Sequence, residues 1–493
     1  MKNLKIFIFN QNWFHLGSLL ESINVYGSNF KNIDIYFFNH NLIVKPLNLH
    51  FDFPASRYFK NRPEKILEEY LEARFLRSNT NLSFHYPKLQ KKIKKDDLLV
   101  NVSSLSEFKT LKWEKTNIGM AVLSFLVMLS KSSEPNIKIY KKLIINLFYT
   151  YFQIFEFLNL LSIDKSKDEF WVCNGRPFHD RVIVEFAVKK KIPLKFFEIG
   201  GEGSNQDRWI LHNNSPHNRV KHQQAIRDHY ELTQPRKSII DNWYKSQRRG
   251  GINAFSKNFS PSSNFIKSNN LFVFFSSSDD EVSAISLDWE SSWGDQLSAV
   301  RFLISYFERN PNLNLAIRIH PNQKNKAKID RINWKSLKTN SSNIQIYNYD
   351  SNVDSYQLLD MAKGILTFGS TIGVEAAYLR KPGALLSKSR WDIIIPHKYI
   401  KSERALTNWI SSIIYEKSFR KADLNKAYKG SLMWGHYMVS AGMPWKIIVR
   451  KKDFRSINVG YLEGRSLKPS LAIISVTKFV RFLRLRFAET RFI

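Results

Sequence analysis

The sequence predicts an α/β protein with two Rossmann-like lobes, a cleft between them and a basic helical tail at the C-terminus. Length is the first observation: 493 residues are about three times the usual size of one domain. The second is the alternation of short apolar runs with longer stretches of helical period, which is typical of α/β proteins. Apolar residues make up 43% and charged residues 24% of the chain, which excludes a chain that is disordered throughout.

The predicted elements follow one another in α/β order. Strands are expected where short apolar runs rich in β-branched and aromatic residues occur, at 4–9, 33–38, 98–102, 169–173, 194–197, 271–275, 313–319, 344–347 and 364–368. Helices are expected between them, at 63–78, 179–191, 295–310, 355–362 and 371–379.

A linker divides the two halves. Residues 253–270 are rich in Ser and Asn and have little periodicity. We therefore expect an N-terminal Rossmann-like lobe over 1–262, a second such lobe over 263–425, and a helical, basic extension over 426–493.

Charge is the unusual feature of the composition. The formal net charge of +32 indicates a polyanionic partner, which can be nucleic acid, an anionic membrane or phosphorylated substrates. The charge is densest in 444–493, where apolar residues such as Val476, Phe479 and Leu483 recur at helical spacing between Lys and Arg. This pattern fits a helix on an anionic membrane surface, and it equally fits a helix packed on its own protein.

Three observations bear on the cellular compartment. A single cysteine, Cys173, excludes an intramolecular disulfide and a structural zinc site with several thiolates. The first apolar run, 6–9, is too short for a signal peptide. Residues 143–163 are long enough to span a bilayer, but Glu156 favours a buried or membrane-surface helix. We expect a cytoplasmic protein, peripheral at the inner face of the cytoplasmic membrane.

The most informative segment begins with a strand that ends in His320-Pro321. In open α/β sheets ligands bind at the carboxyl ends of strands, which is where His320 falls. His320, backed by Arg318, can hydrogen-bond a phosphate or a leaving group, although a structural loop histidine fits this motif alone.

A second strand leads into Gly369-Ser370-Thr371-Ile372-Gly373-Val374-Glu375. This turn of small residues opens a helix, so backbone N–H groups and two hydroxyls form a candidate anion site. Glu375 can accept bonds from ribose hydroxyls, or it can complement the positive end of the helix. A third strand precedes Ser276-Ser277-Ser278-Asp279, a hydroxyl-rich loop that faces the same cleft or is a plain surface loop.

In this order, the serine loop, Gln296, the His-Pro strand end and Ser370-Thr371-x-Gly-x-Glu375 resemble the capsule polysaccharide biosynthesis family. Its members are nucleotide-sugar glycosyltransferases of the two-lobed GT-B type, related to the Kdo transferases of capsule systems. The resemblance implies that the C-terminal lobe binds the donor. It places His320, Ser370 and Thr371 near the phosphate and Glu375 near the ribose. Further residues expected to bind the donor are Ser277, Ser278, Arg318 and Gly369.

The resemblance also implies that the N-terminal lobe holds the acceptor and the catalytic base. One strand ends in Asn174-Gly175-Arg176, which we expect on the acceptor side. Another leads into Glu198-Ile-Gly-Gly-Glu202, where family members carry a Glu-Asp-Gly-type segment. Glu198 matches the first acid and Ile199 replaces the second, so Glu198, Glu202 and a purely structural loop all stay open. His212 and His217 fit either the cleft or the surface.

The sequence thus predicts a glycosyltransferase that moves a sugar from a nucleotide sugar to a surface polysaccharide or a lipid-linked acceptor. Catalysis would use Glu198 or Glu202 with His320. No cofactor is expected, and the transfer is predicted to be metal-independent because no Asp-x-Asp motif of the metal-dependent enzymes occurs at the serine loop. Alternatives are an epimerase or polyol-phosphate transferase of the same architecture, or a non-catalytic protein that binds a membrane surface or nucleic acid; nucleic acid is the less favoured partner because no known nucleic-acid module occurs.

Overall fold

The structure is a computed structural model of the whole chain. It describes residues 2–9, 13–38, 63–87, 89, 102, 104–200, 208–248, 269–278, 280, 283–289, 291–415, 421–452 and 458–467. These ranges leave out several features of the sequence analysis. They are the predicted strand at 98–102 (of which only Val102 is described), most of the linker, Glu202, Asp279 and the tail after residue 467.

The N-terminal lobe is built on a seven-stranded sheet of order β13-β6-β5-β4-β1-β2-β3. The five strands from β5 to β3 are parallel to one another, whereas β6 and β13 are antiparallel to their neighbours. The strands are β1 Lys2–Ile8, β2 Phe30–Phe37, β3 Asn81–His85, β4 Asp168–Cys173, β5 Leu194–Gly200, β6 Arg208–His212 and β13 Met443–Pro444.

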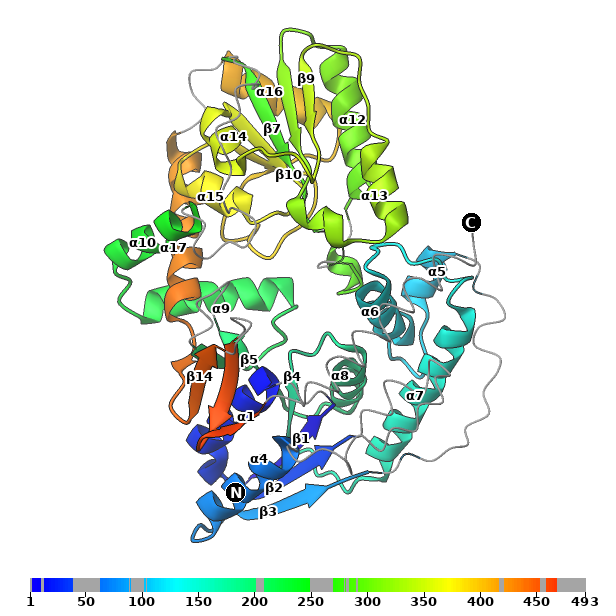
Figure 1. The fold of residues 1–493 in the computed structure, drawn as a ribbon, viewed down its shortest axis with the longest axis vertical. Coiled ribbons are helices and arrows are strands. Elements are labelled where there is room, and N and C mark those ends of the chain that lie inside the picture. Colours follow the sequence, from blue (N-terminus) through cyan, green and yellow to red (C-terminus); the bar gives the residue numbers. More distant parts are fainter. Residues whose placement is uncertain are drawn as a thin grey trace.

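Helices cover both faces of this sheet (Figure 1). On one face α1 (Trp13–Tyr26) and α4 (Pro63–Phe75) share a core with β1 and β2. On the other face a larger core joins the sheet to α5 Leu105–Thr110, α6 Ile118–Ser130, α7 Lys141–Leu160 and α8 Phe178–Lys190. Among the described helices, α7 alone is long and apolar enough to cross a membrane, and 56% of its apolar window is buried within the protein. This burial favours the core-helix alternative.

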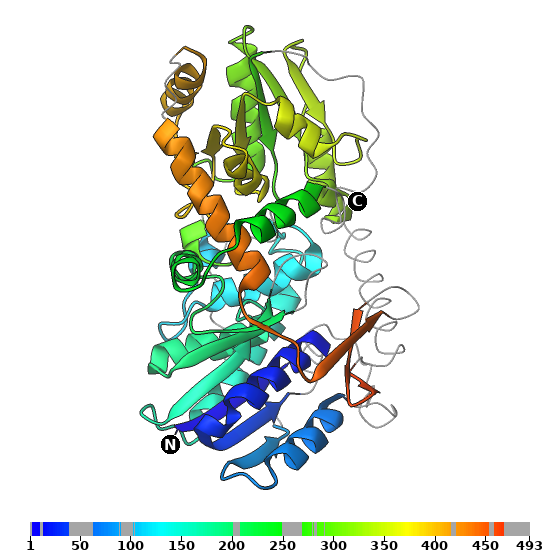
Figure 2. The same ribbon diagram turned by 90° about the vertical axis from the view of Figure 1, so that its left-hand side faces the viewer.

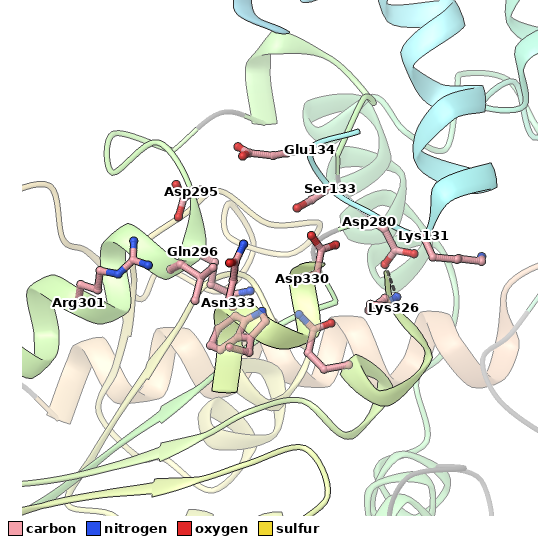
Figure 3. Close-up of a pocket in the computed structure, with 13 residues that line it drawn as sticks. Lys131, Ser133, Glu134, Asp280, Asp295, Gln296, Arg301, Lys326, Asp330 and Asn333 are labelled. Carbon is pink, nitrogen blue, oxygen red and sulfur yellow. Dashed lines mark hydrogen bonds and ion pairs between the residues drawn. The ribbon is translucent and has the colours of Figure 1, made fainter. Parts of the chain in front are cut away.

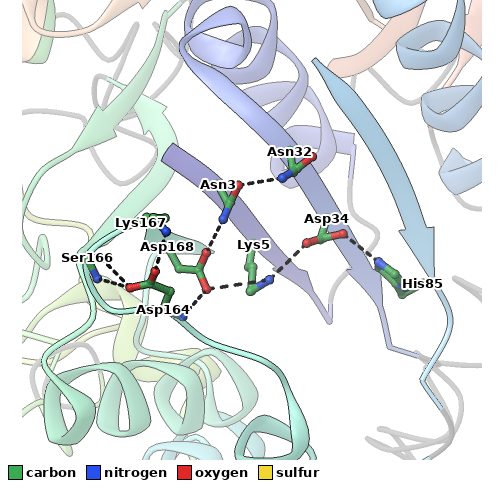
Figure 4. Close-up of polar contacts among 9 residues, drawn as sticks. All are labelled: Asn3, Lys5, Asn32, Asp34, His85, Asp164, Ser166, Lys167 and Asp168. Atoms are coloured by element: carbon green, nitrogen blue, oxygen red, sulfur yellow. Dashed lines mark hydrogen bonds and ion pairs between the residues drawn. The ribbon is translucent and has the colours of Figure 1, made fainter. Parts of the chain in front are cut away.

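A polar ladder runs across the first strands of the same sheet (Figure 4). Lys5 Nζ lies 3.2 Å from Asp34 Oδ2 and 4.0 Å from Asp168 Oδ2. Asp34 Oδ1 lies 3.1 Å from His85 Nε2, and Asn3 Nδ2 donates to Asp168 Oδ1 at 2.9 Å. These side chains are paired with one another across β1 to β4, and His85 lies at the end of the edge strand β3, so the ladder serves the fold.

The C-terminal lobe has a six-stranded, all-parallel sheet of order β12-β11-β10-β7-β8-β9. Its strands are β7 Leu271–Phe275, β8 Asn314–Arg318, β9 Ile344–Tyr347, β10 Gly364–Thr367, β11 Gly383–Leu385 and β12 Lys398–Tyr399. One face carries α12 (Gln296–Glu308) and α16 (Glu403–Ile414); the other carries α14 (Ser355–Met361) and α15 (Ile372–Tyr378). The prediction of two Rossmann-like lobes is therefore confirmed.

Three helices connect the lobes. α9 (Arg219–Leu232), α10 (Lys237–Arg248) and α17 (Lys421–Ser440) share one apolar cluster with residues of the C-terminal lobe such as Trp391. Figure 2 shows α17 running along the side of the molecule from one lobe to the other. Gly430 makes this possible, because a Cβ there would lie 2.0 Å from the carbonyl oxygen of Ile394.

After α17 the chain returns to the N-terminal lobe. β13 pairs with β6, and β14 Ile448–Lys452, β15 Asn458–Leu462 and β16 Arg465–Ser466 form a small antiparallel sheet. Buried Glu21 on α1 fixes this return, because its Oε1 accepts bonds from the backbone N–H groups of Lys446, Ile447 and Ile448 at 2.7–3.1 Å. The prediction that 426–493 is helical is thus wrong for 443–452 and 458–466, because the helix ends at Ser440 and the backbone that follows bonds to other elements. The amphipathic helix predicted around Val476, Phe479 and Leu483 lies outside the described residues and stays a prediction.

Candidate functional site

Three loops of the C-terminal lobe meet at the carboxyl edge of its sheet. Ser276 follows β7, and its Oγ accepts a bond from the backbone N–H of His320, which follows β8, at 2.7 Å. Ser277 Oγ donates to the carbonyl of Phe368, which follows β10, at 3.2 Å. The three predicted motifs are therefore neighbours in space, as expected for parallel strands that end at one edge.

Side chains from the neighbouring helix and loop fix the serine loop. Gln296, at the start of α12, accepts from the Ser277 N–H at 2.7 Å and donates to the Ser277 carbonyl at 3.3 Å. Ser278 Oγ donates to Asp280 Oδ1 and accepts from Asn322 Nδ2, both at 3.1 Å. Asp280 also pairs with buried Lys326. The serine loop is thus held by Gln296 at Ser277 and by Asp280 and Asn322 at Ser278.

His320 is neutral at physiological pH. Burial first, and then the charges of Lys326 and Arg318, lower the pKa of His320 to about 4. Its Nδ1 accepts a bond from the backbone N–H of Asn322 at 3.1 Å, which assigns the proton to Nε2. His320 can therefore donate one hydrogen bond without carrying a charge.

Arg318 points toward the α14 side of the lobe. Its guanidinium donates to the carbonyl of Asn348 at 2.7 Å and lies 3.4 Å from Ser355 Oγ. Burial lowers the pKa of Arg318 to about 10, so it remains a cation. These bonds anchor the segment between β9 and α14, and a contact of Arg318 with a donor phosphate stays a prediction.

The turn after β10 has the conformation that its small residues indicate. Gly369 has φ +95°, and Ser370 N–H donates to Thr367 Oγ1 at 3.0 Å. Thr371 is exposed and α15 begins at Ile372. Glu375 lies in the first turn of α15 and accepts from Tyr356 of α14 at 3.4 Å. Its proposed contact with a ribose stays a prediction.

The candidate residues of the N-terminal lobe form a partly buried polar cluster. Asn174, in the turn after β4, donates from Nδ2 to Glu198 Oε1 at 2.5 Å. Asn174 Oδ1 lies 2.6 Å from His217 Nε2, which therefore donates to it. His212 on β6 lies 3.8 Å from Glu198 Oε2. Burial raises the pKa of Glu198, which makes its carboxylate a stronger base than an exposed one.

Arg390 of the C-terminal lobe completes this cluster. Its charge opposes the effect of burial on the Glu198 pKa. Burial and Arg390 together lower the pKa of His212 to about 4 and that of His222 to about 3, so both are neutral. Within the described residues Arg390 Nε is buried without a hydrogen-bond partner.

Arg390 is the functional candidate that the sequence analysis missed. It follows β11 by five residues, so the strand-end rule that selected His320 also applies to it. The loop around it is held by the N-terminal half: Arg219 pairs with Asp392 at 2.8 Å and Gln223 donates to Ser389 O at 3.4 Å.

Arg176 connects the two lobes. It bonds to the carbonyls of Asp280 and Ser283, the latter at 3.2 Å, while Arg181 Nη1 donates to the carbonyl of Ala284 at 2.8 Å. Gly175 has φ +82° and gives the turn before α8 its shape. The acceptor role predicted for Asn174, Gly175 and Arg176 stays a prediction, as does the role of Glu202, which is outside the described residues. Among the described side chains no group of three or more His, Cys, Asp and Glu residues is placed to hold a metal ion.

Comparison with known proteins identifies one family. Residues 260–394 match the family described as capsule polysaccharide biosynthesis protein. A comparison with curated proteins finds no match.

Solved structures show only distant likeness. The beta Kdo 2,4 transferase of KpsC from Thermosulfurimonas dismutans is 10% identical over 54% of this chain and 78% of that chain, with a TM-score of 0.35. The UDP-GlcNAc 2-epimerase from Neisseria meningitidis is 13% identical over 89% of this chain and 98% of that chain, with a TM-score of 0.26. The segment that holds all three donor-loop motifs, residues 260–394, is thus the part of the chain that matches the family model of capsule polysaccharide biosynthesis proteins.

Proposed function

We propose that the protein is a glycosyltransferase of capsule or other surface polysaccharide synthesis. It transfers a sugar from a nucleotide sugar to a polysaccharide or lipid-linked acceptor, without a metal ion. The donor lies against the loops after β7, β8 and β10, and the acceptor lies against the ends of β4 and β5. The net charge of +32 supports a peripheral position at the anionic inner face of the cytoplasmic membrane.

One observation carries this proposal: two different polar edges face each other across the lobes. The C-terminal edge offers hydroxyls and the neutral Nε2–H of His320, which suit the oxygens of a leaving phosphate. The N-terminal edge offers Glu198, a carboxylate of raised pKa within a hydrogen-bonded cluster. Transfer of a sugar to a hydroxyl requires these two functions, a group that stabilises the leaving phosphate and a base.

In the proposed step one bond to the anomeric carbon forms and another breaks. The acceptor hydroxyl oxygen forms a bond to the anomeric carbon of the donor sugar while its proton passes to the carboxylate of Glu198. The bond between the anomeric carbon and the phosphate oxygen breaks, and the nucleotide leaves with that electron pair. His320 Nε2–H donates a hydrogen bond to the leaving phosphate, whose negative charge increases in the transition state.

The test is a panel of nucleotide sugars with the purified protein and its His320→Ala variant. We expect turnover with one donor, and a loss of about 10²- to 10³-fold in kcat/KM when His320 is removed. His85→Ala, the same change at the polar ladder of the N-terminal lobe, serves as the matched control and should keep full activity. Absence of nucleotide binding and turnover across the panel would overturn the proposal, as would equal activity of His320→Ala and wild type.

A further inference from the structure

A cavity of about 240 Å³ lies between the lobes, beside the donor loops but separate from them (Figure 3). The N-terminal lobe contributes the segment after α6, with Ser133 and Glu134. The C-terminal lobe contributes the start of α12, the short helix Pro321–Asn325 and α13 (Lys328–Lys335). None of the residues predicted to bind donor or acceptor lines this cavity.

Direct bonds between the lobes form its wall. Ser132 Oγ donates to Asp330 Oδ1 at 3.0 Å, and the carbonyl of Lys131 accepts from the N–H of Ala327 at 3.3 Å. Asp295 caps α12 through the N–H of Ser298 at 2.7 Å. In Figure 3 Ser133, Asp295, Asp330 and Gln296 surround the open space. The cavity therefore exists only when the two lobes are together.

One buried side chain in the lining lacks a partner. Gln323 is 3% exposed, and among the described residues its Oε1 accepts no hydrogen bond. A buried polar atom without a partner costs free energy of folding, because it has lost its bonds to water and gained none in return. A ligand hydroxyl in the cavity would remove this cost, so Gln323 points to a ligand that donates hydrogen bonds.

The charges of the lining disfavour an anionic ligand. Asp280 and Lys326 neutralise each other as a pair. The remaining charged side chains are two cations, Lys131 and Arg301, and three acids, Glu134, Asp295 and Asp330. Acids therefore outnumber cations in the lining, although the chain as a whole has a net charge of +32. This excess of negative charge disfavours phosphates and nucleotides. Amide and carboxylate oxygens here suit hydroxyl donors instead.

The volume of the cavity narrows the choice of ligand further. Pockets for drug-sized ligands measure about 300–1,000 Å³, so 240 Å³ suits a single sugar ring better than a nucleotide sugar. Gln296 lines the cavity and also bonds to Ser277, so one side chain separates the cavity from the donor loops. A sugar unit held here would lie next to the predicted site of transfer.

We propose that this interlobe cavity is a saccharide subsite that binds one uncharged sugar unit of the acceptor, with Gln323 as a hydrogen-bond acceptor. The assignment of this sugar to the acceptor rests on the proposed function. The binding test of the cavity itself requires no turnover.

The experiment measures saturation-transfer NMR signals of three uncharged probes, the methyl glycosides of glucose, galactose and N-acetylglucosamine. We expect at least one to bind wild-type protein, and its affinity to fall about 2- to 10-fold in Gln323→Leu, which removes one neutral hydrogen bond. Gln224→Leu, the same change at an exposed position of α9, is the matched control and should bind like wild type. Gln323→Leu removes an unpartnered polar atom, so its thermal midpoint should not fall.

Further measurements separate this proposal from the proposed function. With an active donor, Gln323→Leu should raise KM for the acceptor and leave KM for the donor unchanged. A probe that binds through Gln323 in a protein without transferase activity would support the subsite and reject the transferase. Equal probe affinity in Gln323→Leu and wild type, failure of all three probes to bind wild type, or displacement of the probe by free nucleotide would each overturn the subsite.

Discussion

The two edges that face each other differ in how they are built. The C-terminal edge consists of three strand-end loops joined by neutral hydroxyl, amide and backbone groups, with the uncharged His320 among them. The N-terminal edge holds a partly buried carboxylate, several neutral histidines and an arginine contributed by the other lobe. The first arrangement is suited to holding a ligand in a fixed position, and the second to moving a proton. The proposed division of labour between lobes therefore follows from the chemistry of each edge.

The largest effect should come from removing the base of the N-terminal edge. Glu198→Gln keeps the shape of the side chain and can keep a bond to Asn174, but it cannot accept a proton. We expect kcat to fall about 10²- to 10⁴-fold while nucleotide affinity, measured by thermal shift with and without nucleotide, stays unchanged.

The control for this change is Glu156→Gln at an exposed position of α7, which should behave like wild type. If Glu198→Gln weakens nucleotide binding as strongly as it slows turnover, the two edges do not have separate tasks. If Glu202→Gln alone abolishes turnover, the base lies in the segment 201–207 and Glu198 is a structural partner of Asn174.

The same comparison explains what the sequence predicts and what it does not. The C-terminal edge could be predicted because each of its motifs is contiguous and directly follows an apolar strand, as in Ile319-His320-Pro321. The N-terminal cluster draws on Asn174, Glu198, His217 and Arg390, and only the fold brings residues so far apart in the chain together. Glu198 and Asn174 could be found as strand ends, whereas the contact of Arg390 depends on how the lobes are placed.

The prediction of a helical C-terminal extension was wrong for a related physical reason. The sequence predicts a helix at 443–452 and 458–466, but backbone groups of these residues bond to Glu21 and to neighbouring strands. Contacts with distant segments determine whether such short segments form strands or helices. The local sequence pattern carries no information about these contacts.

A change of intermediate size, in stability, is expected when Gly373 of the C-terminal edge is substituted. Its counterpart in the turn of the N-terminal edge is Gly175. Gly175 is required both by its φ of +82° and by space, because a Cβ there would lie 2.6 Å from the Phe196 ring. Gly373 is required by space alone: a Cβ there would lie 2.5 Å from the fully buried Trp391 ring. Gly373→Ala should therefore lower the free energy of unfolding by about 1–3 kcal/mol, measured by chemical denaturation.

The double variant Gly373→Ala/Trp391→Phe tests the cause. If the clash is responsible, the smaller ring should make the alanine less costly than it is beside Trp391, which a double-mutant cycle measures. Additive losses would show instead that Gly373 is needed for the local backbone of α15.

The smallest effect should be a displacement of the pH profile when the contribution of one lobe to the other is removed. Arg390 lowers the pKa of Glu198 against the larger, opposite effect of burial, and it faces His212, His217, His222 and Tyr437 as well. Arg390→Met removes the positive charge, so the pKa of Glu198 should rise further. A base works only when it is deprotonated, and the acid limb of kcat/KM should therefore move to higher pH. Arg390→Lys keeps the charge and should leave the limb close to that of wild type. A limb that stays in place in Arg390→Met, with Glu198→Gln inactive, would mean that the lobes stand farther apart during turnover than in this structure, so that the C-terminal lobe holds the donor without tuning the base.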